Sequence, residues 1–598
     1  MAGWDELKRA VFALVLVGGL WPAGAMAQAG GEPAPSAAAK ELPPLVVEAK
    51  SKSPTKKAAA KKSPKAVATS PSASPSPSAP EPGSGAETAK GPVAGIAAER
   101  SATGTKTDTP LLETPRTINV VPRAQIEQQQ AQSISEALRY TPGVVVSTYG
   151  HDGILESNNL VRGFIAPRYL DGLRLAQDPA TGFIQNSTDA YMFGRIEVLK
   201  GSASALYGQA PPGGLINLVS KRPTFEEHNE IQFQTGSFNR AQAAFDFNGV
   251  AGAPGTFAYR VVGLARDTDL QVDGQEAERY FVSPSFTWRP SADTTFTLLA
   301  HASHNEGYGP HHFVPLALTS KSAPFGRIPY SRNLGDPTND NYSADQFMIG
   351  YELEHRFNET LTFRQNLRYS YAESDLLALR ADGLFPDART IFRTQNYVAG
   401  DSSDIAVDNQ LQVNVTTGPL AHQLLFGVDY QYGSGFIDVR SGIAPLQDAY
   451  NPVYGLPMPG PSLLTPAIVG NFEREQIGAY VQDQIALDRW RLTLGGRYDR
   501  AQATIENDAL PPLPNNPAEL DDNDTTGFAG LSYIFDIGLA PYVSYSTSFD
   551  PSASASLQSP LGEPLKPTTG EGYELGIKYQ PRGLDTLITT AWFEVTQQ

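Results

Sequence analysis

The stretch Thr362-Phe363-Arg364-Gln365-Asn366-Leu367-Arg368-Tyr369-Ser370-Tyr371 decides the fold class. Successive side chains of a β-strand point to opposite faces, so a period of two in polarity predicts a strand with one apolar face. Here that face carries Phe363, Leu367, Tyr369 and Tyr371, and the polar face carries Arg364, Asn366, Arg368 and Ser370. Residues 491–499 and 542–550 repeat the pattern, and in the latter Val543, Tyr545 and Phe549 are expected on one face. A soluble sandwich and an outer-membrane barrel could both use such strands.

The connections between these strands separate the two folds. About 15 strands can be traced, and short and long connections alternate between them. The short connections are 289–293, 357–359, 417–419, 487–489, 535–538 and 581–583. The long ones are 305–343, 372–402, 433–471, 501–524 and 550–569. Outer-membrane barrels have short periplasmic turns and long external loops. A sandwich has no reason to lengthen every second loop, so the sequence predicts an all-β transmembrane barrel.

Composition removes several function classes. The chain of 598 residues has no cysteine, which excludes disulfide scaffolds, thiolate zinc sites and cysteine nucleophiles. Its formal net charge of −17 argues against nucleic-acid binding, which needs a basic surface. The sequence contains neither His-Glu-x-x-His nor Gly-x-Ser-x-Gly, and Gly104-Thr105-Lys106-Thr107 is not a complete phosphate-binding loop. We therefore do not expect an enzyme.

The N-terminus has the three parts of a secretory signal peptide. Lys8 and Arg9 precede an apolar stretch, 10–20, and the small residues Ala25-Met26-Ala27 follow it. The apolar stretch is too short for a membrane-spanning anchor, and cleavage is expected after Ala27. No later segment reaches about 18 uninterrupted apolar residues. An exported chain of this kind can still cross a membrane as a closed barrel.

A Ser-, Pro-, Ala- and Lys-rich segment, 51–95, follows the signal peptide. Such a composition cannot bury enough apolar surface to offset the entropy of ordering, so we expect a flexible linker. Seven lysines and no acidic residue lie between Lys50 and Lys65. This basic run is consistent with a solvated tether, and attraction to an anionic membrane surface is the alternative.

Mixed α/β patterning lies between the linker and the alternating strands. Residues 133–140 predict a short helix with Ser133 as N-cap and Glu136 completing a capping box. The helix should stop at Thr141-Pro142-Gly143. Short strands are predicted at 144–146, 195–199 and 214–219. These elements together predict a small globular domain.

An ordered set of motifs in this domain and in the barrel carries a family resemblance. The motifs are 102–110, 136–138 with 140–144, 161–164, 169–173, 195–201, 205–208, 212–214, 217–223, 481–484, 494–499 and 573–579. Each motif alone is weak, but their order is specific. The chain resembles TonB-dependent ferric siderophore receptors, and most closely the ferric hydroxamate (ferrichrome-type) receptors of the bacterial outer membrane.

The resemblance implies an architecture and a function. The fold would be a barrel of about 22 strands filled by an N-terminal α/β plug domain. The protein would bind a ferric siderophore outside the cell and import it into the periplasm, driven by TonB with ExbB and ExbD. We expect a monomer surrounded by outer-membrane lipid, with no cofactor or metal of its own, since the ferric siderophore is cargo. The expected segments are a signal peptide (1–27), TonB box and linker (28–96), plug (97–223) and barrel (224–598), with about seven strands expected beyond Gln598.

The resemblance also assigns a TonB box. It falls on Leu45, Val46, Val47, Glu48 and Ala49, close behind the signal peptide. Physically, this is a short segment with β-branched residues that suits addition as a strand to the sheet edge of a partner.

Three residues match the family's contacts between plug and barrel. Arg162 and Arg195 match two plug arginines that pair with barrel glutamates, and Glu574 matches one of those glutamates. The strand pattern supports Glu574 independently, because Leu575 and Ile577 take the lipid side. The second glutamate would lie beyond Gln598. The alternative explanation is ordinary lumen polarity.

Ligand contacts are expected in one long loop and in the plug. The candidates are Tyr149, Tyr308, His311, His312 and Phe313. A siderophore saturates the coordination of its iron, so the histidines are expected to donate hydrogen bonds or to be exposed, and not to ligate metal. Tyr149 replaces the family's ligand-contacting plug arginine, and the loop between Phe164 and Tyr169 is short. Both features disfavour ferrichrome itself. A haem or cobalamin receptor and a passive porin are the rival functions.

Overall fold

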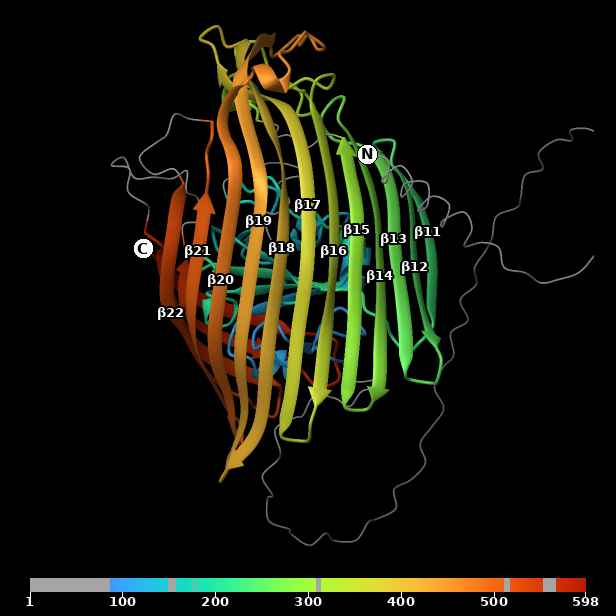
Figure 1. The fold of residues 1–598 in the computed structure, drawn as a ribbon, viewed down its shortest axis with the longest axis vertical. Coiled ribbons are helices and arrows are strands. Elements are labelled where there is room, and N and C mark those ends of the chain that lie inside the picture. Colours follow the sequence, from blue (N-terminus) through green and yellow to red (C-terminus); the bar gives the residue numbers. More distant parts are fainter. Residues whose placement is uncertain are drawn as a thin grey trace, which may run out of the picture.

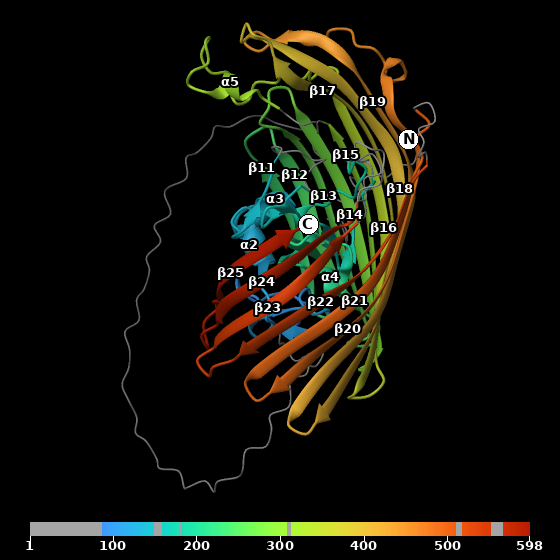
Figure 2. The ribbon, with the colours of Figure 1, turned by 90° about the vertical axis from the view of Figure 1, so that its left-hand side faces the viewer.

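The computed structural model describes residues 87–148, 158–175, 177–179, 181–307, 313–509, 517–551 and 566–598. A long, strongly curved sheet forms a wall, and a smaller α/β domain lies against its concave face (Figures 1 and 2). Among the described residues, no helix has the length and apolar character needed to cross a membrane.

The wall is one antiparallel sheet of 15 strands that pair in chain order, with β11 and β25 at its edges. The strands are β11 (His228–Thr235), β12 (Ala241–Ala251), β13 (Phe257–Asp269), β14 (Glu276–Ser291), β15 (Thr294–Gly307), β16 (Asn341–Arg356), β17 (Leu361–Leu384), β18 (Thr390–Thr417), β19 (Leu420–Asp448), β20 (Thr465–Leu487), β21 (Trp490–Ile505), β22 (Ala518–Tyr533), β23 (Leu539–Asp550), β24 (Thr568–Tyr579) and β25 (Ile588–Gln597). This confirms the strand count and the barrel-type sheet predicted from the sequence.

Alternation along each strand separates the two faces of the wall. On β24, Glu574 and Lys578 are buried on the concave side, whereas Leu575 and Ile577 are 58% and 45% exposed. On β17, Arg368 is buried and its neighbour Tyr369 is exposed. The outer face is therefore apolar and the inner face polar, as period two predicts for a barrel in lipid.

Aromatic side chains pair on the outer face. Beside the short turns, the Trp490 and Tyr533 rings lie 4.8 Å apart, and farther along the strands the Tyr545 and Tyr573 rings lie 4.9 Å apart. On β21, the exposed Trp490 and Tyr498 are separated by roughly 26 Å along the strand. With the strand tilt of about 35–45° found in outer-membrane barrels, that separation corresponds to a height of roughly 19–22 Å, close to the apolar band of about 25 Å.

Two of the predicted long loops are mostly strand. Residues 372–402 were expected to form a loop, but β17 continues to Leu384 and β18 begins at Thr390. Likewise, 433–471 is largely occupied by β19, which ends at Asp448, and by β20, which begins at Thr465. Beyond the lipid band the outward-facing side chains contact water, so Glu373 and Asp375 can be polar there, while the inward-facing Leu376 and Ala378 stay buried and backbone pairing continues. The strands therefore project past the rest of the wall (Figure 1).

The smaller domain is built around a five-stranded sheet in the order β3-β9-β10-β7-β8. Its strands are β3 (Ile118–Pro122), β7 (Arg168–Leu170), β8 (Leu173–Arg174), β9 (Phe193–Lys200) and β10 (Gly214–Ser220). Smaller sheets pair β1 (Arg100–Ser101) with β2 (Thr109–Pro110), and β4 (Val144–Val145), β5 (Leu160–Val161) and β6 (Phe164–Ile165). The helices are η1 (Leu111–Glu113), α2 (Arg123–Gln128), α3 (Ile134–Leu138), η2 (Ala190–Met192) and α4 (Ser204–Tyr207); α5 (Leu316–Thr319) and η3 (Pro461–Leu463) belong to wall loops.

The predicted capped helix is α3. The Ser133 side chain accepts a hydrogen bond from Glu136 N at 3.1 Å, as a capping box requires. The Glu136 carboxylate reaches back to Gln132 N at 2.8 Å, one residue before the N-cap. The helix ends at Leu138, and Gly143 adopts φ +70 in the following turn. The predicted helix and its stop signal are confirmed.

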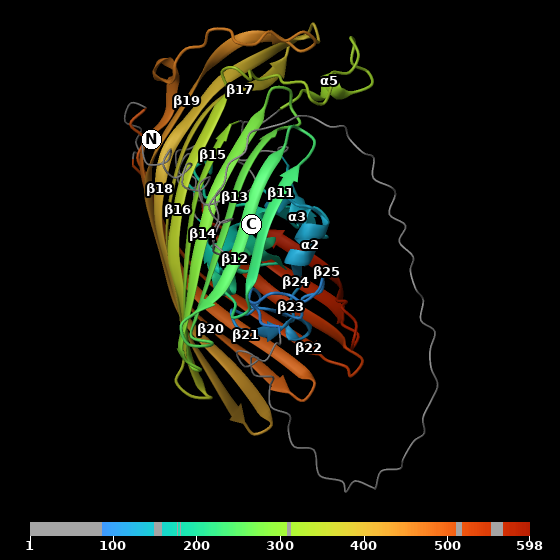
Figure 3. The same ribbon diagram turned by 90° about the vertical axis from the view of Figure 1, so that its right-hand side faces the viewer.

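The α/β domain fills the concave side of the wall (Figures 2 and 3). One hydrophobic cluster contains Ile196 and Leu218 of the domain together with Ala244, Val262 and Met348 of the wall. The two parts therefore share a core. This confirms the prediction of an α/β plug inside the barrel lumen.

Phe549 departs from the predicted alternation of β23. It is fully buried, whereas Val543 is 49% exposed. The ladder between β22 and β23 ends at Ser546, and beyond it the backbone of Phe549 bonds to the plug. Its N donates to Ser204 Oγ at 3.2 Å, and its O accepts from Ala210 N at 3.0 Å. The plug has replaced a neighbouring strand there, so the strand period no longer decides which side is buried.

Candidate functional site: the contact between plug and wall

Glu574 on β24 is the best-connected carboxylate between plug and wall. It forms an ion pair with Arg162 and accepts a hydrogen bond from the Tyr542 hydroxyl. Thr117 donates to it twice, through its backbone N at 3.0 Å and its Oγ1 at 2.7 Å. The structure thus brings Arg162 and Glu574 together, both with buried side chains.

Backbone geometry helps to aim Arg162. The residue lies in the turn between β5 and β6, where it adopts φ +51 and Gly163 adopts φ +90. Positive φ is uncommon for residues with a side chain and carries strain of about 1–3 kcal/mol. The guanidinium also lies 4.0 Å from the centre of the Phe593 ring on β25. A strained turn is therefore held in place by contacts with two strands of the wall.

Lys578 supplies a second anchor on the same strand. Its Nζ donates to the carbonyl oxygens of Leu111 and Thr114 at 2.6 and 2.7 Å, at the two ends of η1. The strand period places Lys578 in the lumen with Glu574, but the sequence shows nothing of these partners, since both are backbone atoms. Two turns of the plug are thus fixed to one strand.

Lys106 is an anchor that motif analysis missed. Its Nζ lies 2.8 Å from Asp408 on β18 and 3.2 Å from the Tyr480 hydroxyl on β20. The ammonium also lies 4.2 Å from the centre of the Tyr480 ring. In the sequence, Lys106 falls within the incomplete phosphate-binding loop and the 102–110 motif, and neither indicates a partner in the wall. Asp408 and Tyr480 are remote in the chain, so only the fold reveals this contact.

Three further ion-pair clusters lie on the other side of the plug. Lys221 contacts Asp246 at 2.7 Å, and burial lowers the pKa of Lys221 to about 8 although that carboxylate opposes the shift. Arg222 contacts both Asp171 of the plug and Glu352 of β16. The remaining cluster joins Asp189 of the plug to Arg266 and Arg279 of the wall. Burial raises the pKa of Asp189, but the two guanidinium groups more than offset it and leave that pKa below its usual value.

Arg195 does not share the surroundings of Glu574. The resemblance pairs Arg195 with a second barrel glutamate that is expected beyond Gln598, so this pairing stays a prediction. In the described residues Arg195 contacts Glu87, Glu197 and the backbone carbonyls of Thr88, Gly91 and Arg100. Arg195 is central in the plug sheet, opposite Pro122 of β3 and Val219 of β10.

The remaining candidate residues are mostly outside the described part of the chain. This applies to the TonB box, 45–49, and to Tyr149, Tyr308, His311 and His312. Phe313 is described and is half-buried at the start of the segment that follows β15. Within the described ranges, no group of three or more His, Asp or Glu side chains could hold a metal ion.

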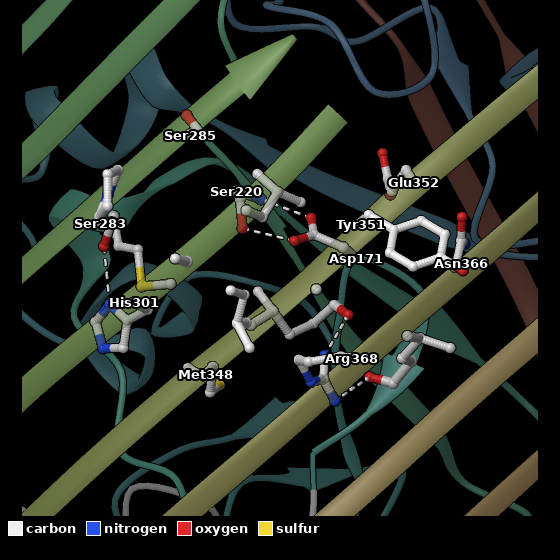
Figure 4. A pocket seen from close by; sticks show the side chains of 18 of the residues that line it. Asp171, Ser220, Ser283, Ser285, His301, Met348, Tyr351, Glu352, Asn366 and Arg368 are labelled. Carbon is white, nitrogen blue, oxygen red and sulfur yellow. Dashed lines mark hydrogen bonds between the residues drawn. The ribbon is translucent and has the colours of Figure 1, made fainter. Parts of the chain in front are cut away.

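A small cavity lies where the plug meets strands β13 to β17 (Figure 4). It measures about 50 Å³, whereas pockets for small organic ligands usually measure about 300–1,000 Å³. Around it, Asp171 accepts from Ser220 Oγ, and Arg368 donates to the Leu170 carbonyl. The cavity is therefore too small for a siderophore.

The chain matches two family models. The model described as TonB dependent receptor-like, beta-barrel covers residues 285–598, and the TonB-dependent Receptor Plug Domain covers residues 110–215. The ferrichrome outer membrane transporter/phage receptor of Escherichia coli K12 is 37% identical over 541 residues, which is 86% of this chain and 70% of that protein. The ferrioxamine B receptor of Salmonella typhimurium is 35% identical over 86% of this chain and 72% of its own length.

Solved structures agree in fold. The ferric preacinetobactin receptor of Acinetobacter baumannii superposes with a TM-score of 0.71 at 23% identity, covering 84% of this chain and 74% of that one. The alcaligin outer membrane receptor of Bordetella pertussis gives a TM-score of 0.62 at 20% identity, with 84% and 74% covered. With plug, wall and family models in agreement, the chain belongs to the TonB-dependent receptors of the bacterial outer membrane.

Proposed function

We propose that this receptor binds a ferric siderophore of the hydroxamate class outside the cell and imports it into the periplasm. The relatives that share 35–37% identity are named for ferrichrome and ferrioxamine, which both hold iron through hydroxamate groups. The similarity extends through plug and wall, so it includes the elements that would contact ligand. The proposed role is transport, and not catalysis.

The anchored plug is the observation that carries the transport mechanism. Glu574, Lys578, Asp408, Asp246 and Glu352 each connect the wall to plug residues. Buried pairs of this kind are costly to break, about 3–5 kcal/mol when one partner is lost. A plug held at so many points does not leave an open pore, which argues against a passive porin. Import must therefore move the plug with energy from outside the receptor.

TonB, energised by ExbB and ExbD, is the proposed source of that energy. The box at 45–49 would add as a strand to a sheet edge of TonB. Residues 50–86 could span at most roughly 120–130 Å if fully extended. A tether of that reach lets a partner anchored in the inner membrane engage the box from across the periplasm. The receptor is proposed to work as a monomer in outer-membrane lipid.

Ligand recognition is assigned to the outer side of the plug and to the loop after β15. Tyr149, Tyr308 and Phe313 would contact the siderophore through their rings, and His311 and His312 would donate hydrogen bonds. The iron in such a complex has no open coordination position, so its recognition depends on the shape and polarity of the organic shell. No resident metal or cofactor is needed.

Growth of an iron-starved strain without its own siderophore receptors tests this function. The full-length receptor should restore growth on ferrichrome-type or ferrioxamine-type chelates and should not do so on haem. Growth on haem alone would assign the receptor to the haem class, and no growth on any iron chelate would overturn the proposal. The remaining rival is a cobalamin receptor. It is tested by the growth of a cobalamin auxotroph on added cobalamin, with and without the receptor.

A further inference from the structure

The pairing between β22 and β23 stops partway along both strands. Their ladder has five pairs and ends at Phe528 and Ser546, although β22 begins at Ala518 and β23 continues to Asp550. Each of the two strands keeps its other neighbour, β21 or β24, over its whole length. The wall is therefore divided between β22 and β23 beyond Ser546, and we name this place the β22–β23 seam.

A plug segment, residues 202–210, takes the place of β22 along the seam. Phe549 N donates to Ser204 Oγ at 3.2 Å, and Phe549 O accepts from Ala210 N at 3.0 Å. In an antiparallel ladder the N–H and C=O of one residue bond to the same residue of the neighbouring strand. If the register of the five pairs continued, that residue would be Thr525. The plug thus uses the backbone groups of β23 that a complete wall would give to β22.

Side chains satisfy the freed backbone groups on the β22 side of the seam. Gly527 N donates to Thr547 Oγ1 at 2.9 Å, and Thr525 N donates to Asp524 Oδ1 at 2.7 Å. In a continued ladder the same two N–H groups would bond to the carbonyls of Thr547 and Phe549. Closing the seam would therefore exchange one set of hydrogen bonds for another and leave these wall backbone groups paired.

Two buried hydroxyls mark the pairs that are missing. Among the described residues, Thr526 Oγ1 and Ser548 Oγ are buried without a hydrogen-bond partner, and each residue is only 2% exposed. A continued register places Thr526 directly opposite Ser548 on the inner face. Cross-strand Thr and Ser side chains hydrogen-bond to each other. A closed seam would therefore satisfy both hydroxyls that the open seam leaves unpaired.

The sequence of β23 also fits a closed seam. Val543 and Tyr545 lie in the paired part of the strand and are exposed on the outer face, whereas Phe549 is fully buried. In a continued ladder, the period of two would place Phe549 on the outer face with them. The apolar alternation of β23 is thus the pattern of a strand that pairs with β22 over its whole length.

Two carboxylates oppose closure. A continued register places Asp524 directly opposite Asp550, and like charges in this position destabilise a ladder. In the open seam, Asp524 instead accepts from Thr525 N. This repulsion favours the open seam as long as the plug segment is seated.

We propose that the β22–β23 seam is a two-state element of the wall, which plug residues 202–210 hold open and which closes when they withdraw. The inference rests on the proposed import, because a displaced plug is what releases β23. Closure gives β23 a strand partner in place of the plug, so no unpaired strand edge is left in the membrane. The wall therefore stays sealed along this line while the plug is displaced.

A pair of cysteines reports the closed seam. The chain has no cysteine of its own, and facing residues of a non-hydrogen-bonded pair have Cα atoms about 4.5 Å apart, which a disulfide can bridge. Thr526→Cys with Ser548→Cys should therefore cross-link only when the seam closes. Phe528→Cys with Ser546→Cys is the matched control, because this pair is already part of the ladder and should cross-link at rest.

Oxidation of the full-length receptor in outer-membrane vesicles tests the seam without import. Adding Asp524→Asn to the Thr526 and Ser548 cysteine pair should speed cross-linking about two- to fivefold, since it removes a like-charge pair from the closed state. Asp521→Asn is the control, because Asp521 pairs with Arg500 at 2.7 Å on the outer face. Equal rates for the two changes would overturn the proposed seam.

Oxidation in energised cells tests the seam during transport. With ferric ferrioxamine B outside, the Thr526 and Ser548 cysteine pair should cross-link at least about tenfold faster in a strain with TonB than in one without it, because a minor state is at most about 10% populated at rest. The Phe528 and Ser546 pair should cross-link equally in both strains. A rate for the seam pair that does not depend on TonB would contradict closure during import.

The outcomes separate the seam from the proposed function. If wild type takes up iron and the seam pair cross-links no faster with TonB, the seam proposal fails while siderophore import stands. If wild type shows no TonB-dependent uptake, the proposed function fails, and the vesicle comparison of Asp524→Asn with Asp521→Asn still decides whether the seam closes.

Discussion

Arg162 of the plug and Glu574 of β24 form a buried ion pair that joins residues 412 positions apart in the chain. Thr117 and Tyr542 complete the hydrogen bonds of the carboxylate. One glutamate on the wall thus holds two separate plug segments, the β5–β6 turn and the residue before β3. The plug's position depends on this ion pair, because a buried carboxylate without its partner is strongly disfavoured.

Replacing Glu574 should loosen the plug. Glu574→Ala leaves Arg162 buried without its counter-charge, a loss of about 3–5 kcal/mol. Passive ion conductance of the full-length receptor in planar bilayers should rise. Glu571→Ala is the control, since Glu571 lies on the same strand and accepts from Tyr545 on the outer face. Unchanged conductance in Glu574→Ala would contradict a locking role.

Removing the ammonium of Lys578 should destabilise the start of the plug. Lys578→Met retains much of the length of the side chain but leaves the carbonyls of Leu111 and Thr114 without this donor. Each hydrogen bond to a charged group is worth about 1.5–3 kcal/mol. Calorimetry should show a lower plug transition temperature. An unchanged transition temperature would mean that water satisfies these two carbonyls without a loss of plug stability.

Lys106 and Asp408 should behave as a coupled pair. Lys106→Met leaves Asp408 buried without its cation and should lower plug stability by roughly 3–5 kcal/mol. Adding Asp408→Asn to Lys106→Met removes the unpaired charge, so the double variant should recover part of that loss. A double-mutant cycle measured by denaturant unfolding gives the coupling. Strict additivity of the two changes would show that the pair does not interact.

Glu197 should make plug stability depend on pH. Burial raises the pKa of this carboxyl in the folded plug, although Arg195 and the hydroxyls of Thr103 and Ser101 oppose the shift. Between the unfolded value of about 4.5 and the higher folded value, the folded state binds more protons. Stability should therefore fall as pH rises through that window. Glu197→Gln should flatten this part of the unfolding profile, and an unaltered slope would assign it to another group.

The sequence predicts the wall better than it predicts the contacts within it. Period two places Glu574 and Lys578 in the lumen because each strand has lipid on one side and plug on the other. The period-two prediction fails where a strand no longer lies between lipid and plug. Strands β17 to β20 continue beyond the lipid band, where outward-facing side chains no longer have to be apolar, and Phe549 is buried because the plug replaces its neighbouring strand.

Contacts between side chains and backbone atoms cannot be predicted from the sequence. Arg195 donates to the carbonyls of Thr88, Gly91 and Arg100, which any residue type would offer, so the sequence does not indicate these partners. Lys578 likewise binds carbonyls. A pattern of side chains carries information about a partner only when the partner is itself a side chain, as with Arg162 and Glu574.

The central claim is TonB-dependent import of a ferric hydroxamate, and uptake of radioactive iron tests it most directly. An iron-starved strain lacking other siderophore receptors would carry either the full-length receptor or a form without residues 45–49, and both would receive labelled ferrioxamine B. The account predicts accumulation of iron with the intact receptor, and surface binding without accumulation after the deletion. Equal accumulation in both strains, or none in either, would contradict it.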